Sequence, residues 1–420
     1  MNDNWKKNII LFLASQTVSL FGSSLVQYAI YWHITLETQS GLMMTIYIIC
    51  GFLPTFFLSP FAGVWADRYN RKTLIILSDS LIAASTLIMA ILYMMGYKAI
   101  WLLFLMSAVR ALGAGIQTPA IGAILPQLVP EDKLTKVNGT NGSIQAFVTL
   151  ISPMISGALL SAITIEQIFF IDVITAAIAV SILLVLKVAP HAKALEKQTT
   201  SYFDDLSRGF AYIKDHTFVK KFFRYCAIFF VLAAPPAFLT GLQVTRSFGN
   251  EVWRLSAIEV SFSVGMIAGG IIITSWGGFK NRTHTMMLAS LIFGACSFAL
   301  GSIPVFWIYL AFMALCGVAM PFFNTPSMVL LQEKVEPDYL GRVFGVLGMI
   351  SSALMPLGML VFGPISDFVR IEWLLMGTGI LLMIQGIALI GDKVLIEAGQ
   401  PVAKLEPTAE PDFTEPEPGI

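Results

Sequence analysis

The sequence predicts an all-α integral membrane protein with twelve transmembrane helices, arranged as two halves of six helices each. Three observations predict this fold class. Of the 420 residues, 56% are hydrophobic and only 12% are charged, about half the charged fraction of soluble domains. The apolar residues gather in runs long enough to cross a bilayer, which takes about 20 residues. The longest polar interruption, residues 188–221, leaves six such runs on either side.

The first half comprises residues 1–187, with candidate spans at 9–34, 42–66, 74–96, 99–126, 138–162 and 165–187. The first span follows a basic start, as a signal peptide would. Its apolar run continues to about Ile34, which is too long for a signal peptide, and no cleavage site follows. We therefore expect the first span to be a retained helix.

A linker at residues 188–221 follows, in which Phe203, Leu206, Phe210 and Ile213 recur at helical spacing. This pattern predicts an amphipathic helix at the membrane surface. The second half comprises residues 222–391, with candidate spans at 222–244, 256–278, 285–303, 305–331, 343–366 and 372–391. Residues 392–420 are acidic and rich in proline, and this composition predicts a disordered tail.

The seventh span contains two adjacent prolines, Pro235 and Pro236. Because proline cannot continue a regular helix, we expect a break there. The neighbouring aromatic residues Phe229, Phe230 and Phe238 would face lipid or contact an apolar substrate, and the sequence leaves both alternatives open.

The distribution of lysine and arginine predicts the orientation in the membrane. With the N-terminus in the cytoplasm, four of the 26 basic residues fall outside and Arg110 lies within a span, which leaves 21 on the cytoplasmic side. The four outside are Lys98, Arg246, Arg254 and Arg370. We therefore expect a multi-pass protein of the plasma membrane with both termini in the cytoplasm.

An internal repeat relates the two halves. Residues 129–144 (VPEDKLTKVNGTNGSI) align without gaps onto residues 335–350 (VEPDYLGRVFGVLGMI), with seven identities. The pair Thr118–Pro119 matches Thr325–Pro326 at nearly the same offset. Because each half has an even number of spans, both copies enter the membrane in the same direction, which predicts a parallel repeat.

The chain also carries a charged turn after the second span. It supplies Gly63, Asp67, Arg68, Arg71 and Lys72 at the positions of the pattern G-x-x-x-D-R-x-x-R-[RK]. With twelve spans in two parallel halves, this turn resembles the signature of the major facilitator superfamily. The loops at 129–144 and 335–350 are similar to those of its macrolide-efflux branch of drug:proton antiporters. The resemblance implies the major facilitator fold and a role for Asp67, near Arg342, in latching the cytoplasmic side.

Four ionisable residues are predicted to lie at membrane depth: Asp79, Arg110, Asp172 and Glu259. Each is costly there, by about 2.5–3.5 kcal/mol on insertion scales, and such residues usually face the protein interior or a wet cavity. They are candidates for proton coupling, and the alternative is that they pair only to hold helices together. The resemblance adds that exporters of this family place a proton-linked arginine in the fourth span, where Arg110 lies.

Polar side chains recur on one face of the fifth span and one face of the first. Such a face lines a substrate path or packs helices through small residues. Amides are larger than packing requires, so we expect a substrate cavity lined by Gln16, Gln27, Asn141, Gln145 and, in the tenth span, Asn324.

No nucleotide-binding loop and no hydrolase motif occur in the chain. The four cysteines lie in apolar runs without the spacing of a metal site. The net charge is zero, which gives no indication of nucleic acid as a partner. We therefore expect a non-enzyme without cofactor or metal, whose partners are a small amphipathic substrate, protons and membrane lipid. We expect a monomer, and a separate ATPase partner stays open.

Together these patterns predict a secondary transporter that exports amphipathic compounds, such as macrolide-like antibiotics or other drugs, by proton antiport through alternating access. Export of a siderophore or another metabolite by the same fold fits nearly as well. A membrane sensor that transports nothing is a third alternative, for which the acidic tail is the one supporting feature.

Overall fold

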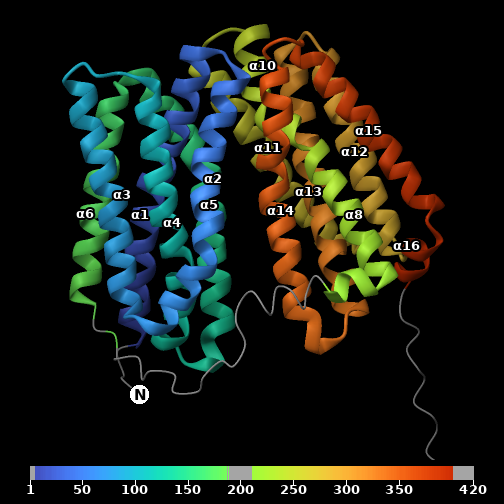
Figure 1. The fold of residues 1–420 in the computed structure, drawn as a ribbon, viewed down its shortest axis with the longest axis horizontal. Coiled ribbons are helices and arrows are strands. Elements are labelled where there is room, and N and C mark those ends of the chain that lie inside the picture. Colours follow the sequence, from blue (N-terminus) through green and yellow to red (C-terminus); the bar gives the residue numbers. More distant parts are fainter. Residues whose placement is uncertain (1–4, 187, 189–210, 401–420) are drawn as a thin grey trace, which may run out of the picture.

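A computed structural model describes residues 5–186, 188 and 211–400, with the side chains of Pro60, Asp67 and Asp338 excluded. Within these ranges every regular element is a helix, and the helices form two bundles side by side (Figure 1). The first bundle contains α1 (Trp5–Thr38), α2 (Gly41–Arg68), α3 (Arg71–Met94), α4 (Ile100–Leu128), α5 (Leu134–Ala162) and α6 (Ile165–Val185), with the short 3₁₀ turn η1 (Glu131–Lys133) before α5.

The second bundle contains α8 (Thr217–Leu232), α9 (Ala234–Phe238), α10 (Thr240–Ser247), α11 (Val252–Trp276), α12 (Arg282–Ser302), α13 (Phe306–Lys334), α14 (Pro337–Ile365), α15 (Ile371–Gly391) and α16 (Lys393–Ala398). Eleven of the described helices are long and apolar enough to cross a membrane. The predicted span at 222–244 is instead divided among α8, α9 and α10. The predicted break is confirmed, since α8 ends three residues before Pro235.

The two bundles repeat one packing scheme. In the first bundle α2 packs on α4, and α3 packs on α4 and α6; in the second, α11 packs on α13, and α12 packs on α13 and α15. The aligned residues Val129 and Val335 cap the C-termini of the corresponding helices α4 and α13. The all-helical membrane fold and its two parallel halves therefore agree with the sequence repeat.

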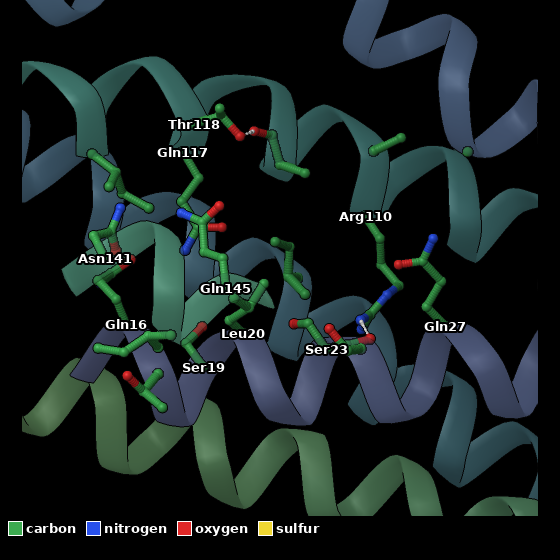
Figure 2. A pocket seen from close by; sticks show the side chains of 18 of the residues that line it. Gln16, Ser19, Leu20, Ser23, Gln27, Arg110, Gln117, Thr118, Asn141 and Gln145 are labelled. Atoms are coloured by element: carbon green, nitrogen blue, oxygen red, sulfur yellow. Dashed lines mark hydrogen bonds between the residues drawn. The ribbon is translucent and has the colours of Figure 1, made fainter. Parts of the chain in front are cut away.

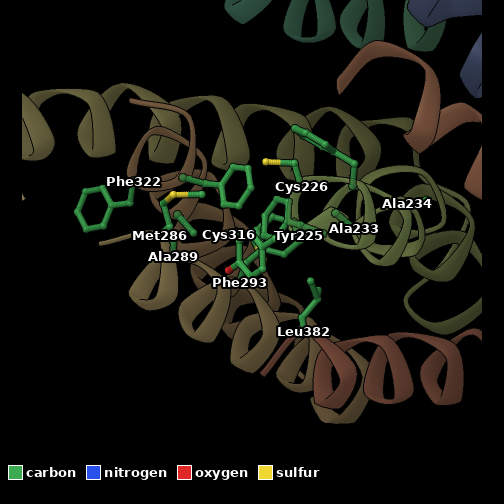
Figure 3. Packing of buried hydrophobic residues seen from close by; sticks show 14 of the residues in the cluster. Tyr225, Cys226, Ala233, Ala234, Met286, Ala289, Phe293, Cys316, Phe322 and Leu382 are labelled. Atoms are coloured by element: carbon green, nitrogen blue, oxygen red, sulfur yellow. The ribbon is translucent and has the colours of Figure 1, made fainter. Parts of the chain in front are cut away.

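The core of the second bundle is unusually aromatic (Figure 3). Phe229 is fully buried and stacks on Phe323, with ring centroids 3.9 Å apart, while Phe230 packs edge-on against the same ring. These two rings therefore face neither lipid nor a cavity, contrary to both alternatives considered from the sequence. Proline breaks the helix here, and the aromatic rings fill the space beside the break.

The bundles meet at one end of the molecule. We call the end that carries Trp5 and α16 the termini end, and the opposite end the far end. At the far end α5 packs on α11 and α2 packs on α14. A Cβ atom added at Gly363 of α14 would lie 1.7 Å from the Thr45 hydroxyl oxygen of α2, and one at Gly157 would lie 1.8 Å from the Ser256 hydroxyl oxygen. Glycine is what permits both helix contacts.

At the termini end the same helices are apart. A Cβ atom added at Gly63 in α2, at Gly139 in α5, or at Gly341 or Gly345 in α14 would meet no atom of another helix within 4 Å. The two bundles diverge toward this end in Figure 1. The structure is therefore closed at the far end and open at the termini end.

The structure differs from the sequence expectation at the start of the tail. Residues 393–398 form α16, whose N-cap Asp392 accepts hydrogen bonds from the backbone N–H groups of Val394 and Leu395. Asp392 also pairs with Lys221 at 2.8 Å, and the Leu395 side chain is buried. The cap, the ion pair and the buried leucine together order this segment, which composition alone did not indicate. Residues 401–420, and residues 189–210 of the predicted linker helix, lie outside the described ranges.

Candidate functional site

Two adjoining cavities lie where the bundles face each other. The first-half cavity has a volume of about 520 Å³ and is lined by α1, α2, α3, α4 and α5 (Figure 2). Its lining follows α1 from Gln16 to Ile30, fourteen residues further along, or about 21 Å of helix. The interhalf cavity has a volume of about 560 Å³ and is lined by residues of both bundles. The two share four lining residues, Gln27 and Tyr47 among them.

Arg110 and Asp172 form an ion pair in the wall of the first-half cavity, with Nη1 and Oδ2 2.5 Å apart. The Asp172 side chain is 1% exposed and that of Arg110 is 11% exposed. Thr86 donates to Asp172 at 2.9 Å, and Arg110 donates to the Ser23 carbonyl at 3.1 Å. Four helices thus meet at one pair of charges. Both carboxylate oxygens and both terminal nitrogens of the guanidinium have hydrogen-bond partners, so the pair is tolerated at this depth.

Asp79 lies nearer the termini end in a separate cluster. Its Oδ1 accepts hydrogen bonds from Ser19 at 2.6 Å and from Gln117 at 2.7 Å. Its Oδ2 is buried and has no hydrogen-bond partner among the residues that the structure describes. Ser19 and Ser23 are one helical turn apart on α1, so α1 connects the Asp79 cluster to the Arg110–Asp172 pair.

Glu259 is on α11 of the second bundle and lines the interhalf cavity. It makes no hydrogen bond and no ion pair with any residue that the structure describes. The four ionisable candidates therefore separate into one ion pair, one hydrogen-bonded carboxyl group and one carboxylate that faces open space.

Four of the five predicted cavity residues line the first-half cavity: Gln16, Gln27, Asn141 and Gln145. Gln27 lines the interhalf cavity as well. Asn324 is exposed and lines neither cavity. The polar face of α5 has two roles, because Asn141 and Gln145 line the cavity while Ser156 is buried and donates to the Leu25 carbonyl at 2.9 Å.

The charged turn joins helix ends. Arg71 donates to the carbonyls of Ala66 and Ala123, at 2.9 and 2.7 Å. Lys72 donates to the carbonyls of Leu184 and Leu186, at 3.0 and 2.8 Å. These carbonyls lie near the C-termini of α2, α4 and α6, where the helix dipole favours a cation.

Two more of the residues predicted for the gate lie in the described part of the chain. Arg68 is exposed, and the Arg342 guanidinium lies 5.6 Å from the centroid of the Tyr339 ring. The side chain of Asp67 lies outside the description, so the latch between Asp67 and Arg342 stays a prediction.

Sequence reasoning missed several side chains of this candidate site. Gln117 and Thr86 bind the two buried carboxyl groups, and Tyr28, Tyr31 and Tyr47 form much of the interhalf cavity wall. Gln117 precedes the repeated Thr118–Pro119 pair, which is a usable signal. The tyrosines carried no signal, because an aromatic residue in an apolar run is typical of a helix core.

Comparisons with known proteins agree with this architecture. The family model described as Major Facilitator Superfamily matches residues 9–359. The chain is 28% identical over 380 residues to Macrolide efflux protein A of Streptococcus pyogenes, which covers 90% of this chain and 94% of that protein. It is 22% identical over 363 residues to the Staphyloferrin A transporter of Staphylococcus aureus (85% and 89% covered). The crystal structure of the nucleoside transporter NupG superposes with a TM-score of 0.70 at 17% identity, covering 92% of this chain and 98% of that one.

Proposed function

Because the chain belongs to the major facilitator superfamily, we propose that it exports amphipathic compounds in exchange for protons by alternating access. It acts as a monomer and performs no covalent chemistry on its substrate. The family match and the eleven apolar helices both indicate a multi-pass membrane transporter. The direction, the coupling ion and the substrate are the parts that we propose.

The orientation follows from the basic residues. Lys98, Arg246, Arg254 and Arg370 lie at or beside the helix ends of the far end, while Arg71 and Lys72 lie at the termini end. The excess of lysine and arginine at the termini end supports a cytoplasmic location for that end. With this orientation, the structure is the inward-facing state, in which a cytoplasmic compound enters the first-half cavity.

The Arg110–Asp172 pair is the observation that carries the proton-coupling proposal. A proton arriving at Asp172 neutralises the carboxylate, and the Arg110 guanidinium then loses its charged partner. Since this pair joins α4 and α6 and is hydrogen-bonded to α1 and α3, its rupture changes the packing of four helices. A proton bound more tightly in one state than in the other biases the equilibrium between the states.

The relatives supply candidate substrates. The relative that is 28% identical bears the name Macrolide efflux protein A, which supports a macrolide as the first compound to test. The staphyloferrin A transporter is named for a siderophore, and its similarity along 85% of the chain supports siderophore export as the second candidate.

Inverted membrane vesicles test the proposal. We expect uptake of a radiolabelled macrolide to depend on an imposed proton gradient and to fall at least tenfold in Asp172→Asn. Removing one partner of a buried ion pair lowers the stability of a protein by about 3–5 kcal/mol. The melting temperature of the variant is therefore compared with that of the wild type as well. The double variant Arg110→Gln/Asp172→Asn removes both charges and is expected to recover stability without recovering coupled uptake.

Glu166→Gln is the matched control. It breaks an ion pair of 2.7 Å with Lys98, whose side chain is 60% exposed, and should change uptake little. Uptake that survives both collapse of the gradient and Asp172→Asn would exclude the proposed coupling. The same vesicles supplied with metal-free staphyloferrin A, in place of the macrolide, decide between the two substrates.

A further inference from the structure

The second bundle contains a turn that corresponds to the charged turn of the first bundle. Residues 70–72 (NRK) open α3, and residues 281–283 (NRT) open α12, with the asparagine as the N-cap in both cases. The arginine that follows the cap binds the corresponding helix in each bundle. Arg71 donates to a carbonyl of α4 at 2.7 Å, and Arg282 pairs with Glu333 of α13, also at 2.7 Å.

The third residue of the turn distinguishes the two bundles. Lys72 donates to the carbonyls of Leu184 and Leu186 at the end of α6. Thr283 stands in its place, and its hydroxyl donates to the Leu395 carbonyl of α16 at 2.7 Å. The first turn is therefore connected to α6 itself, whereas the second is connected to α16, the short helix that follows α15.

The start of α12 and the end of α16 cap each other at this turn. The Asn281 side chain donates to the Ile396 carbonyl at 2.8 Å, and the backbone N–H of Arg282 donates to the Gly399 carbonyl at 2.9 Å. The first N–H groups and the last carbonyls of a helix have no partner within that helix. Each helix therefore supplies partners for backbone groups of the other.

The other end of α16 is bound to α8. Lys221 of α8 pairs at 2.8 Å with Asp392, which is the N-cap of α16. Farther from the termini end, α8 is bound to α12 directly, through the hydroxyls of Tyr225 and Ser290. At the termini end, α16 therefore bridges these two helices.

The order of α16 depends on these contacts. It contains six residues, and an isolated helix shorter than about 12–15 residues is marginal in water. The segment therefore has two states, a helix docked between α8 and α12 and a released chain. Since α14 packs on α8 and carries Arg342, the docked state also supports the helix of the predicted latch.

We propose that α16 is a strap that takes the place of the lysine contact in the second turn and holds the termini end of α8 against α12. Lys221, Asn281 and Thr283 are its positioning residues. The inference goes beyond the proposed function, because it concerns how the second bundle keeps its shape during alternating access. It is independent of the substrate and of the coupling ion.

Gly399→Ala tests the strap. The added Cβ would lie 2.1 Å from the Asn281 side-chain oxygen and 2.3 Å from the Thr283 hydroxyl oxygen, so α16 has to move away from the turn. The φ angle of Gly399 is −71°, which alanine adopts without strain, so the substitution acts through this contact. Gly391→Ala, at the end of α15, meets open space and is the matched control.

Spin labels at two exposed positions measure the outcome in the purified full chain. One replaces Lys220 on α8 and the other Lys280 beside the turn, with the partly exposed Cys50 replaced by serine. We expect one narrow distance distribution in the parent protein and in Gly391→Ala. In Gly399→Ala we expect a longer mean distance and a distribution about twice as broad, because local release of α16 frees the end of α8.

Thr283→Val is a second test variant, which keeps the shape of the side chain and removes the donor to the Leu395 carbonyl. It should change the distribution in the same direction and to a smaller extent. Thr378→Val is its control, because the buried Thr378 hydroxyl donates within its own helix α15.

An unchanged distribution in Gly399→Ala would overturn the inference, and so would an equal change in Gly391→Ala. If Gly399→Ala fails to fold, Thr283→Val decides, and a distribution in that variant equal to that of Thr378→Val would overturn the inference. The measurement needs neither substrate nor a proton gradient. Failure of proton-driven export would therefore refute the proposed function and leave the strap standing.

Discussion

Asp367 shows how one side chain holds the far end together. It lies in the turn between α14 and α15 and accepts hydrogen bonds from the backbone N–H groups of Gly41 and Leu42 at the start of α2, at 2.7 and 3.0 Å. Ser40 and Arg246 donate to it as well. Its carboxylate thus joins the second bundle to the N-terminus of a helix in the first bundle, where the helix dipole favours an anion.

The same contacts predict a pH dependence of the far-end closure. Partial burial acts to raise the pKa of Asp367, but the N–H groups of Leu42 and Gly41, the Ser40 hydroxyl and Arg246 outweigh it, so the pKa lies below its ordinary value of 3.8. The stabilisation is therefore complete above pH 3.8 and is lost as the pH falls through the lowered pKa.

Replacement of Asp367 by asparagine should reproduce the acid state at neutral pH. Hydrogen bonds to a charged group contribute about 1.5–3 kcal/mol, so we expect the population open at the far end to rise about tenfold. Spin labels at the exposed positions Tyr97 and Phe368, one in each bundle, would report it as a longer distance. Glu372→Gln is the control, because its partners Arg370 and Ser247 lie in its own bundle. An unchanged distance distribution in Asp367→Asn would contradict the assignment.

At the scale of elements, α14 determines how closely the bundles approach. It packs on α2 at the far end and on α8 and α9 within its own bundle. The contact with α2 depends on glycines, because the Gly363 position lies against Thr45 and Gly41. Helices approach this closely only where small residues meet.

Gly363→Ala should therefore open the far end. The added Cβ would lie 1.7 Å from the Thr45 hydroxyl oxygen and 2.7 Å from the Gly41 carbonyl oxygen, so the helices must separate. We expect a shift toward the far-end-open state in the same spin-label measurement. Gly348→Ala in the same helix meets open space and should leave the distances unchanged. Equal effects of the two substitutions would show that helix propensity, and not the contact, is responsible.

At the scale of the whole molecule, the α2–α14 contact indicates how the termini end closes. The two helices run in opposite directions, and Gly41 faces Gly363 at the far end. Gly63 lies 22 residues after Gly41, and Gly341 lies 22 residues before Gly363. Continuing the contact along both helices would place Gly63 opposite Gly341, with Asp67 and Arg342 beside them. The predicted latch therefore fits the closed state of the termini end, which is open in this structure.

Cysteines at Gly63 and Gly341 test that closure. In a background with Cys50 replaced by serine, we expect Gly63→Cys/Gly341→Cys to form a disulfide only when the termini end closes, since the Cα atoms must come within about 7 Å. The crosslinked protein should lose transport and regain it on reduction. The pair Gly63→Cys/Gly377→Cys is the control, because Gly377 lies on α15, which packs on α12 and α8. A crosslink in the control, or none in the test pair under any condition, would refute this geometry.

The sequence by itself determined the membrane fold, the two parallel halves, the break at Pro235 and Pro236, and four amide side chains that line the first-half cavity. These features are recorded locally, in apolar runs, helical spacing and a repeat, because a helix in lipid satisfies its own backbone hydrogen bonds. Local patterns of this kind also identified four ionisable residues within apolar spans: Arg110, Asp172, Asp79 and Glu259.

Only the tertiary structure decided what each of these residues does. Arg110 and Asp172 are 62 residues apart and meet because α4 and α6 both pack on α3. Glu259 has no hydrogen-bond or ion-pair partner among the described residues, because α11 presents it to a cavity. The rotation of each helix about its axis sets these outcomes, and an apolar run does not specify that rotation. The docking of α16, the aromatic wall and the closed far end likewise depend on contacts between distant segments, which the physics of packing determines and the linear pattern does not record.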